Sequence, residues 1–361
     1  MSPKHGLYIH IPFCRAKCDY CDFCSIKSAH VPSWYLEKLS LEMKEYEGIQ
    51  IDTLYVGGGT PSLLSPDQLL SLTEHVRRCF GKEWVEATLE ANPEDLTEES
   101  LIAFRKAGFN RLSVGVQSFD EKKKNFLGRR SPDHLIVRLL KAREVFENLS
   151  LDLIFGVPGE SFDAEWEHLD KVSPDHVSWY NLKIEKGTPL YRDLSAGKKR
   201  LPDDDEQADS YALICEGLRR RGWLRYEISN FARSGFESNH NLKYWHFTPY
   251  IGCGASAAGF AAGLMMQNSS DLSLYRKGKG KSRRLLTSGE EREIQIMMGL
   301  RLEKGVILKD KELKAVHSAT EEMRPFFLLE GKTLKIRPEL FFVSNSLILR
   351  LLEIIFPEKK I

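Results

Sequence analysis

The chain has 361 residues, with 52 Lys and Arg against 51 Asp and Glu, so its net charge is +1. This balance excludes a global basic field of the kind that covers nucleic acid or an anionic membrane, and we expect no nucleic-acid partner. With 42% hydrophobic and 29% charged residues, the composition also excludes a disordered or collagen-like chain. At roughly 150 residues per domain, the length allows about two domains, or one barrel with an appendage.

No stretch of the sequence predicts a membrane span. The most apolar late stretch, from Leu340 to Phe356, is interrupted by five polar or charged residues. The first predicted strand begins too early to leave room for a signal or transit peptide. We therefore expect a cytoplasmic protein.

The first two-thirds of the chain alternates apolar strands with amphipathic helices. Strands separated by helices imply parallel pairing, so six such units predict an α/β fold with a partial (β/α)6 barrel; a doubly wound sheet is the competing topology. In either case ligands bind at the carboxyl ends of the strands. The predicted strands cover residues 7–11, 53–56, 87–91, 111–116, 151–155 and 176–182.

Local signals place three helix starts. Ser65 precedes Pro66 and stands three residues before Gln68, a pattern typical of a capped helix. Ser131, followed by Pro132, is expected to open a second helix. Thr97 is expected to cap a third, which ends at Gly108.

Changes in composition and residue pattern along the sequence predict three parts. The barrel is expected over 1–230, a connecting segment over 231–285, and a small, mainly helical C-terminal domain over 286–361. Within the connecting segment, residues 276–284 carry six Lys or Arg with interleaved Gly. This run predicts an exposed loop, with docking of an anion or a partner as the alternative; interleaved aromatic residues, typical of single-strand nucleic-acid binding, are absent.

Four of the seven cysteines fall within eleven residues. Cys14, Cys18 and Cys21 form C-x3-C-x2-C directly after a predicted strand, and thiolates on short loops hold iron–sulfur clusters. Three thiolates on a [4Fe-4S] cluster leave one iron open to the amino and carboxylate groups of S-adenosylmethionine. Cys24 keeps two alternatives open, a zinc site and a four-cysteine ferredoxin, although we expect it to be a spare thiol.

Further motifs follow the cysteines in a fixed order. They cover residues 8–12 (YIHIP), 21–23 (CDF), 57–62 (GGGTPS), 90–93 (EANP), 115–119 (GVQSF), 152–159 (DLIFGVPG), 226–232 (YEISNFA), 240–245 (HNLKYW) and 299–302 (GLRL). On these motifs the chain resembles the radical S-adenosylmethionine proteins of the oxygen-independent coproporphyrinogen III dehydrogenase-like family. Within that family it is most similar to the HemW-type haem chaperones.

The resemblance implies a role for each matching residue. Cys14, Cys18 and Cys21 match the cluster ligands. Carboxylates suit ribose hydroxyls and a guanidinium suits the methionine carboxylate, while glycines let the backbone approach a ligand closely. The residues that match S-adenosylmethionine-binding positions are Tyr8, Tyr20, Gly58, Gly59, Thr60, Glu90, Gln117, Arg129 and Asp152.

The resemblance also separates two activities. The dehydrogenase subgroup has a further cysteine two positions after the third ligand, where this chain has Phe23, and it has a longer segment before the first cysteine. The resemblance therefore implies binding of haem as cargo and its delivery to acceptor proteins. Coproporphyrinogen III dehydrogenase activity is the alternative, and a homodimer is an open alternative for the assembly.

The haem ligand is the least defined expectation. Imidazole is a common axial ligand of haem iron, which makes His240 the candidate and leaves a hydrogen-bonded structural histidine as the alternative. His246 and Cys253 are nearby alternatives. The chain departs from its relatives at Cys24, where they usually carry Asn, and at Ala258, where they commonly carry His.

Overall fold

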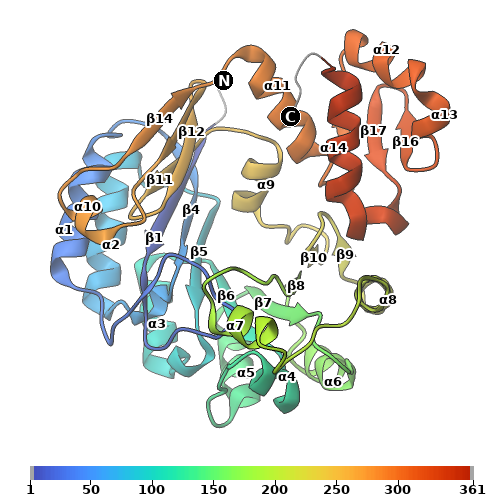
Figure 1. Cartoon of the computed structure of the whole chain (residues 1–361). Helices are drawn as coiled ribbons and strands as arrows, with labels where there is room; N and C mark the ends of the chain where they lie inside the picture. Colours follow the sequence, from blue (N-terminus) through green and yellow to red (C-terminus); the bar gives the residue numbers. More distant parts are fainter. Residues whose placement is uncertain (1–3, 358–361) are drawn as a thin grey trace.

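One large sheet organises most of the molecule. The computed structural model describes residues 4–357, without the side chains of 320 and 322. In this part of the chain the sheet has 12 strands, in the order β14-β13-β12-β11-β1-β4-β5-β6-β7-β8-β10-β9 (Figure 1). Its parallel strands are β1 (His5–Ile11), β4 (Ile51–Gly58), β5 (Glu86–Ala91), β6 (Arg111–Gln117), β7 (Asn148–Phe155), β8 (His176–Asn181) and β11 (Tyr250–Cys253).

Antiparallel strands extend both edges of this parallel core. Beyond β8 lie β10 (Asn230–Ala232) and β9 (Leu224–Arg225), and beyond β11 lie β12 (Ala258–Ala261), β13 (Leu264–Gln267) and β14 (Ser282–Leu285). The short strands β2 (Phe13–Cys14) and β3 (Ile26–Lys27) pair with each other within the cysteine loop.

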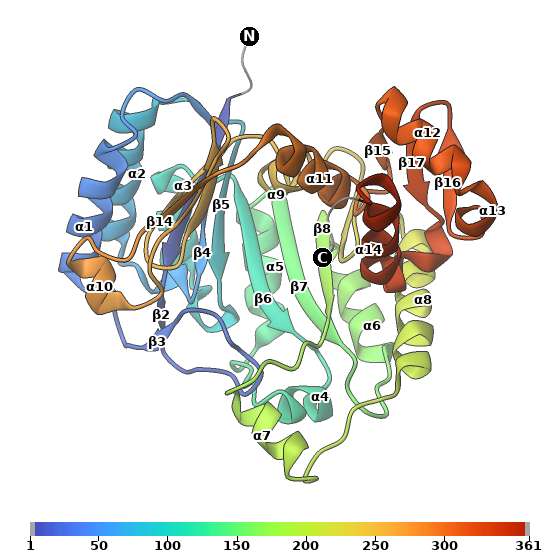
Figure 2. The same ribbon diagram turned by 45° about the horizontal axis from the view of Figure 1, so that its top comes forward.

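Helices cover the outer face of the sheet (Figure 2). The order of the strands from β1 through β4 to β8 never reverses, and this winding is that of a barrel, because a doubly wound sheet reverses its order at a switch point. The predicted partial barrel is therefore confirmed.

The helices between Ser33 and Arg276 are α1 (Ser33–Lys44), α2 (Pro66–Phe80), α3 (Glu98–Ala107), α4 (Glu121–Phe126), α5 (Leu135–Val145), α6 (Asp163–Val172), α7 (Pro189–Ser195), α8 (Asp204–Arg220), α9 (Asn239–Trp245) and α10 (Leu272–Arg276), with 3-10 turns at Pro61–Leu63 and Pro93–Asp95.

The C-terminal part packs beside the barrel. Its helices are α11 (Ser288–Gly299), α12 (Asp310–Ser318), α13 (Thr320–Met323) and α14 (Ser344–Ile355), with a 3-10 segment at Pro338–Val343. They enclose a small antiparallel sheet of β15 (Val306–Ile307), β17 (Thr333–Ile336) and β16 (Phe327–Glu330). In the described residues no helix is long and apolar enough to cross a membrane.

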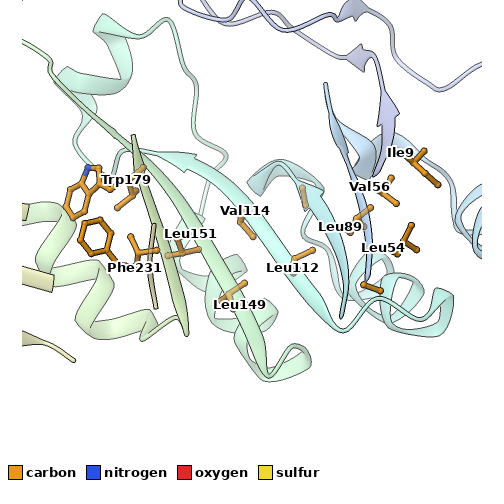
Figure 3. Packing of buried hydrophobic residues seen from close by; sticks show 14 of the residues in the cluster. Ile9, Leu54, Val56, Leu89, Leu112, Val114, Leu149, Leu151, Trp179 and Phe231 are labelled. Carbon is orange, nitrogen blue, oxygen red and sulfur yellow. The ribbon is translucent and has the colours of Figure 1, made fainter. Parts of the chain in front are cut away.

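The two faces of the barrel strands differ in polarity, because successive side chains of a strand point to opposite sides. The outward set packs against the helices as one buried core that includes Leu54, Leu89, Leu112 and Leu151 (Figure 3). The inward set is polar, and its members hydrogen-bond across neighbouring strands, as in Tyr55–Glu90, Ser113–Asp152 and Ser150–His176. We call the space they face the lumen.

Two of the three predicted helix starts are confirmed. Ser65 and Thr97 accept hydrogen bonds from the backbone amides of Gln68 and Ser100, and α3 ends at Gly108 in a left-handed conformation. The prediction at Ser131 is wrong, because α5 begins at Leu135 without a side-chain cap. The Ser131 hydroxyl instead bonds with the ammonium of Lys124, so it does not serve a helix terminus.

The basic run is exposed as expected, but part of it is a strand. β14 covers its last residues and all four side chains of that strand are exposed. Lys281 forms ion pairs with Glu42 and Glu45, and Arg284 pairs with Glu290. Charged side chains on an edge strand discourage pairing with another chain, which gives this run a structural role.

Helix α9 closes the amino end of the barrel. Glu86, at the start of β5, accepts hydrogen bonds from the backbone amides of Asn239 and His240 and from the Ser238 hydroxyl. A carboxylate is favourable at a helix N-terminus because it meets unpaired N–H groups. The opposite, carboxyl end of the parallel strands carries the cysteine loop.

Candidate functional site

The cysteine loop follows β1 at the carboxyl end of the barrel. Cys14 ends β2, and the amide of Cys21 donates to the carbonyl of Cys18 at 3.2 Å. All seven cysteines in the described chain are free thiols, and those of the loop are partly exposed. The loop therefore presents three thiols from a short stretch of backbone. Burial raises the pKa of the Cys21 thiol, and Cys18 and Cys14 are close enough to raise it further.

A glycine backbone supports the loop from β4. The amide of Gly59 donates to the carbonyl of Ile11 at 2.8 Å, and a Cβ on Gly59 would lie 2.7 Å from the Phe13 carbonyl oxygen and 3.0 Å from Cys14 Sγ. Gly58 has a φ of +117°, and its Cβ would lie 2.6 Å from the ring of His10. Only glycine fits such close approaches, so 57–59 works as a cradle for the cysteine loop.

Thr60 and Arg129 connect the thiols to neighbouring strands. Thr60 Oγ1 donates to Cys14 Sγ at 3.3 Å, and one Arg129 nitrogen donates to Cys18 Sγ at 3.4 Å. The other terminal nitrogen of Arg129 donates to Asn92 Oδ1 at 2.7 Å and to the Gly115 carbonyl at 2.6 Å. Burial lowers the pKa of Arg129, but its hydrogen bond to Cys18 and the charges of Cys18, Tyr20 and Glu94 together raise it above its ordinary value, so Arg129 remains a cation beside the thiols.

Asn92 is a site residue that the sequence reasoning missed. Its amide nitrogen donates to Thr60 Oγ1 at 3.1 Å while its carbonyl oxygen accepts from Arg129. It therefore joins the partners of two different cysteines. Its position just beyond the predicted strand 87–91, two residues after Glu90 and in the same motif, was the signal available in the sequence.

The two tyrosines have different surroundings. The Tyr8 hydroxyl is 2.9 Å from His10 Nδ1, and His10 Nε2 is 2.9 Å from the carbonyl oxygen of Cys24. Tyr20 packs on a second buried cluster that contains Leu127 and Leu190. Burial raises the pKa of both phenols, so both stay neutral.

Glu90 and Asp152 project into the lumen from β5 and β7. Glu90 accepts from the Tyr55 hydroxyl at 2.8 Å and from the Gly58 amide at 2.9 Å. Burial raises its pKa to about 7. Burial also raises the pKa of Asp152, against the opposing effect of hydroxyl donors and of Arg111.

Arg111 is a second residue that the sequence reasoning missed. Its side chain is 1% exposed at the start of β6, and its charge opposes the raised pKa values of both Glu90 and Asp152. Two of its nitrogens, Nε and Nη1, have no hydrogen-bond partner in the described residues. The only sequence signal for this inward orientation was the alternation of side chains along the strand, because an arginine at the first position of a strand commonly faces solvent.

Gln117 ends β6 with a φ of +70°, an unusual conformation for a residue with a side chain. The pairing of β6 with β7 shifts register between Gly115 and Gln117. Gly58, Gly59, Thr60, Glu90, Gln117, Arg129 and Asp152 thus all lie on or beyond the strands that reach this end of the barrel.

No group of three or more His, Cys, Asp or Glu side chains in the described residues converges on a point as the ligands of one metal ion do. The thiolates of a multi-iron cluster bind different irons and need no common point. Free thiols, the glycine cradle that a Cβ would fill, and the Arg129 cation beside Cys18 fit a thiolate-ligated cluster.

Cys24 lies apart from this arrangement. Its thiol donates to the carbonyl of Ser270 at 3.3 Å, and it lines an open surface depression together with Phe23, Lys17 and Leu272. Burial raises the pKa of Cys24. The thiol thus has a protein partner outside the loop.

His240 is far from the cysteine loop and closed to solvent. It is 0% exposed; its Nδ1 is 2.9 Å from Thr53 Oγ1, and its Nε2 is 2.8 Å from the Tyr244 hydroxyl. It lies against Gly6, so five residues of β1, roughly 16 Å at ~3.3 Å per residue, separate it from Ile11. This geometry favours the structural alternative over axial ligation. Cys253 is also fully buried, whereas His246 is exposed.

Comparisons with known proteins agree on the family. Residues 8–172 match the family model of the radical SAM superfamily. The chain is 35% identical over 327 residues to the haem chaperone HemW of Lactococcus lactis, covering 87% of this chain and 86% of that protein. It is 33% identical over 340 residues to the mitochondrial radical S-adenosyl methionine domain-containing protein 1 of Danio rerio, covering 86% of this chain and 77% of that protein.

A solved structure matches the fold over nearly the whole length. The coproporphyrinogen III oxidase HemN of Escherichia coli superposes with a TM-score of 0.81 at 22% identity, covering 97% of this chain and 90% of that one. At this identity the likeness shows the fold, including the helices of the C-terminal part.

The glycine cradle predicts a clear effect of one added methyl group. Gly59→Ala should push the loop away from β4 and lower the free energy of unfolding by about 1–3 kcal/mol, the usual cost of overpacking. It should also speed the reaction of the loop thiols with an aromatic disulfide reagent. Gly289→Ala is the control, because its nearest neighbouring atom is 4.0 Å away. Equal thiol reactivity in both variants would contradict the assigned role of Gly59.

The raised pKa of Glu90 predicts a pH-dependent stability. In the folded chain the Glu90 carboxyl keeps its proton up to about pH 7, whereas its ordinary pKa is 4.5. The fold therefore loses stability as the pH rises between these two values, because ionising the buried Glu90 costs free energy. Glu90→Gln removes that cost, and its stability relative to the unmodified chain should rise by about 1–3 kcal/mol from pH 5 to pH 8. Thermal denaturation across this pH range measures the difference in stability, with the exposed Glu83→Gln variant as control. A stability difference that does not change with pH would contradict the raised pKa of Glu90.

Proposed function

Because the chain belongs to the HemW family of radical S-adenosylmethionine proteins, we propose that it binds haem and delivers it to acceptor proteins, and that it carries a [4Fe-4S] cluster together with S-adenosylmethionine. The family name supports haem as cargo. The acceptor is defined here only by its chemistry, as a protein that takes up haem.

The observation that carries the proposal is Phe23 on the cysteine loop. Phe23 occupies the position where the dehydrogenase subgroup has a further cysteine, and its side chain is 64% exposed. The fold shared with HemN does not favour oxidation of coproporphyrinogen III, because one fold hosts different activities. We therefore place haem delivery first and keep the dehydrogenase as the alternative.

The cluster would be held by Cys14, Cys18 and Cys21, and S-adenosylmethionine by the nine residues that match its binding positions. When bound, this pair of groups supplies one-electron chemistry at a sulfonium, which side chains cannot supply. The chain's own residues position and shield them. Thr60 and Arg129 hold two of the thiols, and Glu90 and Asp152 offer acceptors for hydroxyl groups at the rim of the lumen.

We also propose a cytoplasmic location. Free cysteines throughout the described chain, with four of them in one loop, fit a reducing compartment.

Haem titration of the cluster-loaded protein tests the function. We expect saturable binding, seen as a Soret band, and transfer of the haem to an apo-haem protein separated by size. Anaerobic incubation with coproporphyrinogen III, S-adenosylmethionine and a reductant should give no product above a blank. Product formation without saturable haem binding would replace the proposal by the dehydrogenase alternative.

Variants of the four loop cysteines should differ in their content of iron and sulfide. Cys14→Ser, Cys18→Ser and Cys21→Ser should each lose most of the iron and sulfide, because a hydroxyl is a poor ligand for the iron of a cluster. Cys24→Ser should retain both, since its thiol already bonds to the Ser270 carbonyl. Iron and sulfide assays after oxygen-free reconstitution measure this. Loss of iron in the Cys24 variant would overturn the three-ligand assignment and revive the zinc and ferredoxin alternatives.

A further inference from the structure

The bend that ends β6 turns the side chain of Gln117 back over Gly115. The pairing of β6 with β7 skips Val116, and Gln117 follows with its left-handed backbone. A Cβ on Gly115 would lie 2.9 Å from Gln117 Nε2 and 3.7 Å from Arg129 Nη2. Glycine at position 115 therefore leaves the room in which the carboxamide and the guanidinium approach each other at the rim of the lumen.

The residue after Gln117 ties this bend to helix α6. A strained backbone persists only where its surroundings hold it, and Ser118 provides such a hold because its side chain is fully buried. Its hydroxyl donates to Glu165 Oε1 on α6 at 2.6 Å and accepts from the amide of Asp120 at 3.0 Å. The position of Gln117 thus depends on a carboxylate that lies outside the binding rim.

Lys123 neutralises this carboxylate inside the protein. Its Nζ forms ion pairs with Glu165 Oε1 at 3.1 Å and with Glu160 Oε2 at 3.4 Å, and the three side chains are 5% exposed or less. The ammonium also lies 4.5 Å from the centre of the Phe162 ring. Neither Lys123 Nζ nor Glu165 Oε2 has a hydrogen-bond partner in the described residues. Because buried charges are costly unless they are paired, both carboxylates depend on this one ammonium.

Lys123 belongs to α4, the helix that connects Gln117 to Arg129. α4 lies just beyond the carboxyl ends of β6 and β7 (Figure 2), and the amide of Arg129 donates to a carbonyl of this helix at 2.8 Å. Glu160 follows β7, and its other oxygen accepts from the amide of Gly156 at 2.9 Å. A single ammonium therefore joins α4 to α6 and to the end of β7.

We infer that Lys123 is a positioning residue for S-adenosylmethionine, which it serves by fixing the place where Gln117 and Arg129 meet. A buried ion pair adds little net stability compared with apolar side chains of similar volume, so stability alone does not account for three charges enclosed behind this rim. The inference rests on the proposed function, because Gln117 and Arg129 are assigned there to S-adenosylmethionine. It adds the buried residues Lys123, Glu160 and Glu165, which themselves touch no ligand.

Equilibrium dialysis of S-adenosylmethionine against cluster-loaded variants tests this role. Lys123→Met removes the ammonium but keeps an unbranched side chain, and the affinity should fall about tenfold, a usual loss when the partner behind a ligand-binding group is removed. Arg292→Met is the matched control, because Arg292 forms a largely buried ion pair with Glu312 in the C-terminal part. The control should lose stability but keep its affinity; an equal loss of affinity in both variants would overturn the inference.

A milder variant covers the case in which Lys123→Met does not fold. Ser118→Ala removes the hydrogen bond to Glu165 but leaves the ion pairs of Lys123 in place. The affinity for S-adenosylmethionine should fall severalfold while the far-ultraviolet circular dichroism spectrum stays unchanged.

A second substitution distinguishes positioning from a general loosening of the fold. Gln117→Ala should weaken binding by the same factor in the unmodified chain and in Arg292→Met, because distant sites act independently. In Ser118→Ala the factor should be smaller, since the carboxamide has already lost its position. An equal factor in all three backgrounds, including no effect in any of them, would overturn the route from Lys123 through Gln117.

The outcomes separate this inference from the proposed function. If the unmodified protein binds S-adenosylmethionine and the Lys123→Met and Ser118→Ala variants bind it equally well, Lys123 is not a positioning residue while the proposed function stands. If the cluster-loaded unmodified protein binds no S-adenosylmethionine, this inference and the cofactor part of the proposed function are both overturned. Haem titration of the same preparation then decides whether haem binding stands without that cofactor.

Discussion

The barrel strands have to satisfy two environments with one alternating pattern, and the rest of the molecule depends on this constraint. Leu54, Leu89 and Leu112 face the helices, whereas Tyr55, Glu90 and Ser113 face the lumen. Because polar groups withdrawn from water need partners, the inner side chains pair across neighbouring strands. That pairing aligns the strands and brings their ends to one rim, where the cysteine loop, the glycine cradle and Arg129 meet. A shift of one residue in any strand would exchange its two faces.

Elements set by local chemistry could be predicted from the sequence. All six predicted strands are present, because apolar runs bounded by turn residues report burial directly. The cap at Ser65 was predictable since its partner, Gln68, is three residues away. The start of α5 was not, because the Ser131 hydroxyl bonds with Lys124 in the tertiary structure, and no local pattern reveals that competition.

The residues of the candidate site also divide into those that local sequence patterns predict and those that only the fold reveals. The cysteine spacing and the glycine run are local patterns, and in the structure Gly59 lies directly against Cys14. Asn92 and Arg129 act across three strand ends, so their contact depends on the winding of the barrel. His240 was singled out by its motif, yet its position at the closed amino end follows from the contact between Glu86 and α9, which are more than 150 residues apart. Pairings of that sequence separation need the fold itself.

The pairing of β1 with β11 has a consequence for the order of events during synthesis. β1 stands at the beginning of the chain, but the register joins Ile9 to Cys253 on its far side. On the ribosome β1 therefore keeps one unpaired edge until that partner emerges about 240 residues later, which takes roughly 12–50 s at ~5–20 residues per second. During this interval the thiol-bearing segment is held from the β4 side alone, and the free edge of β1 is open to pairing with foreign strands.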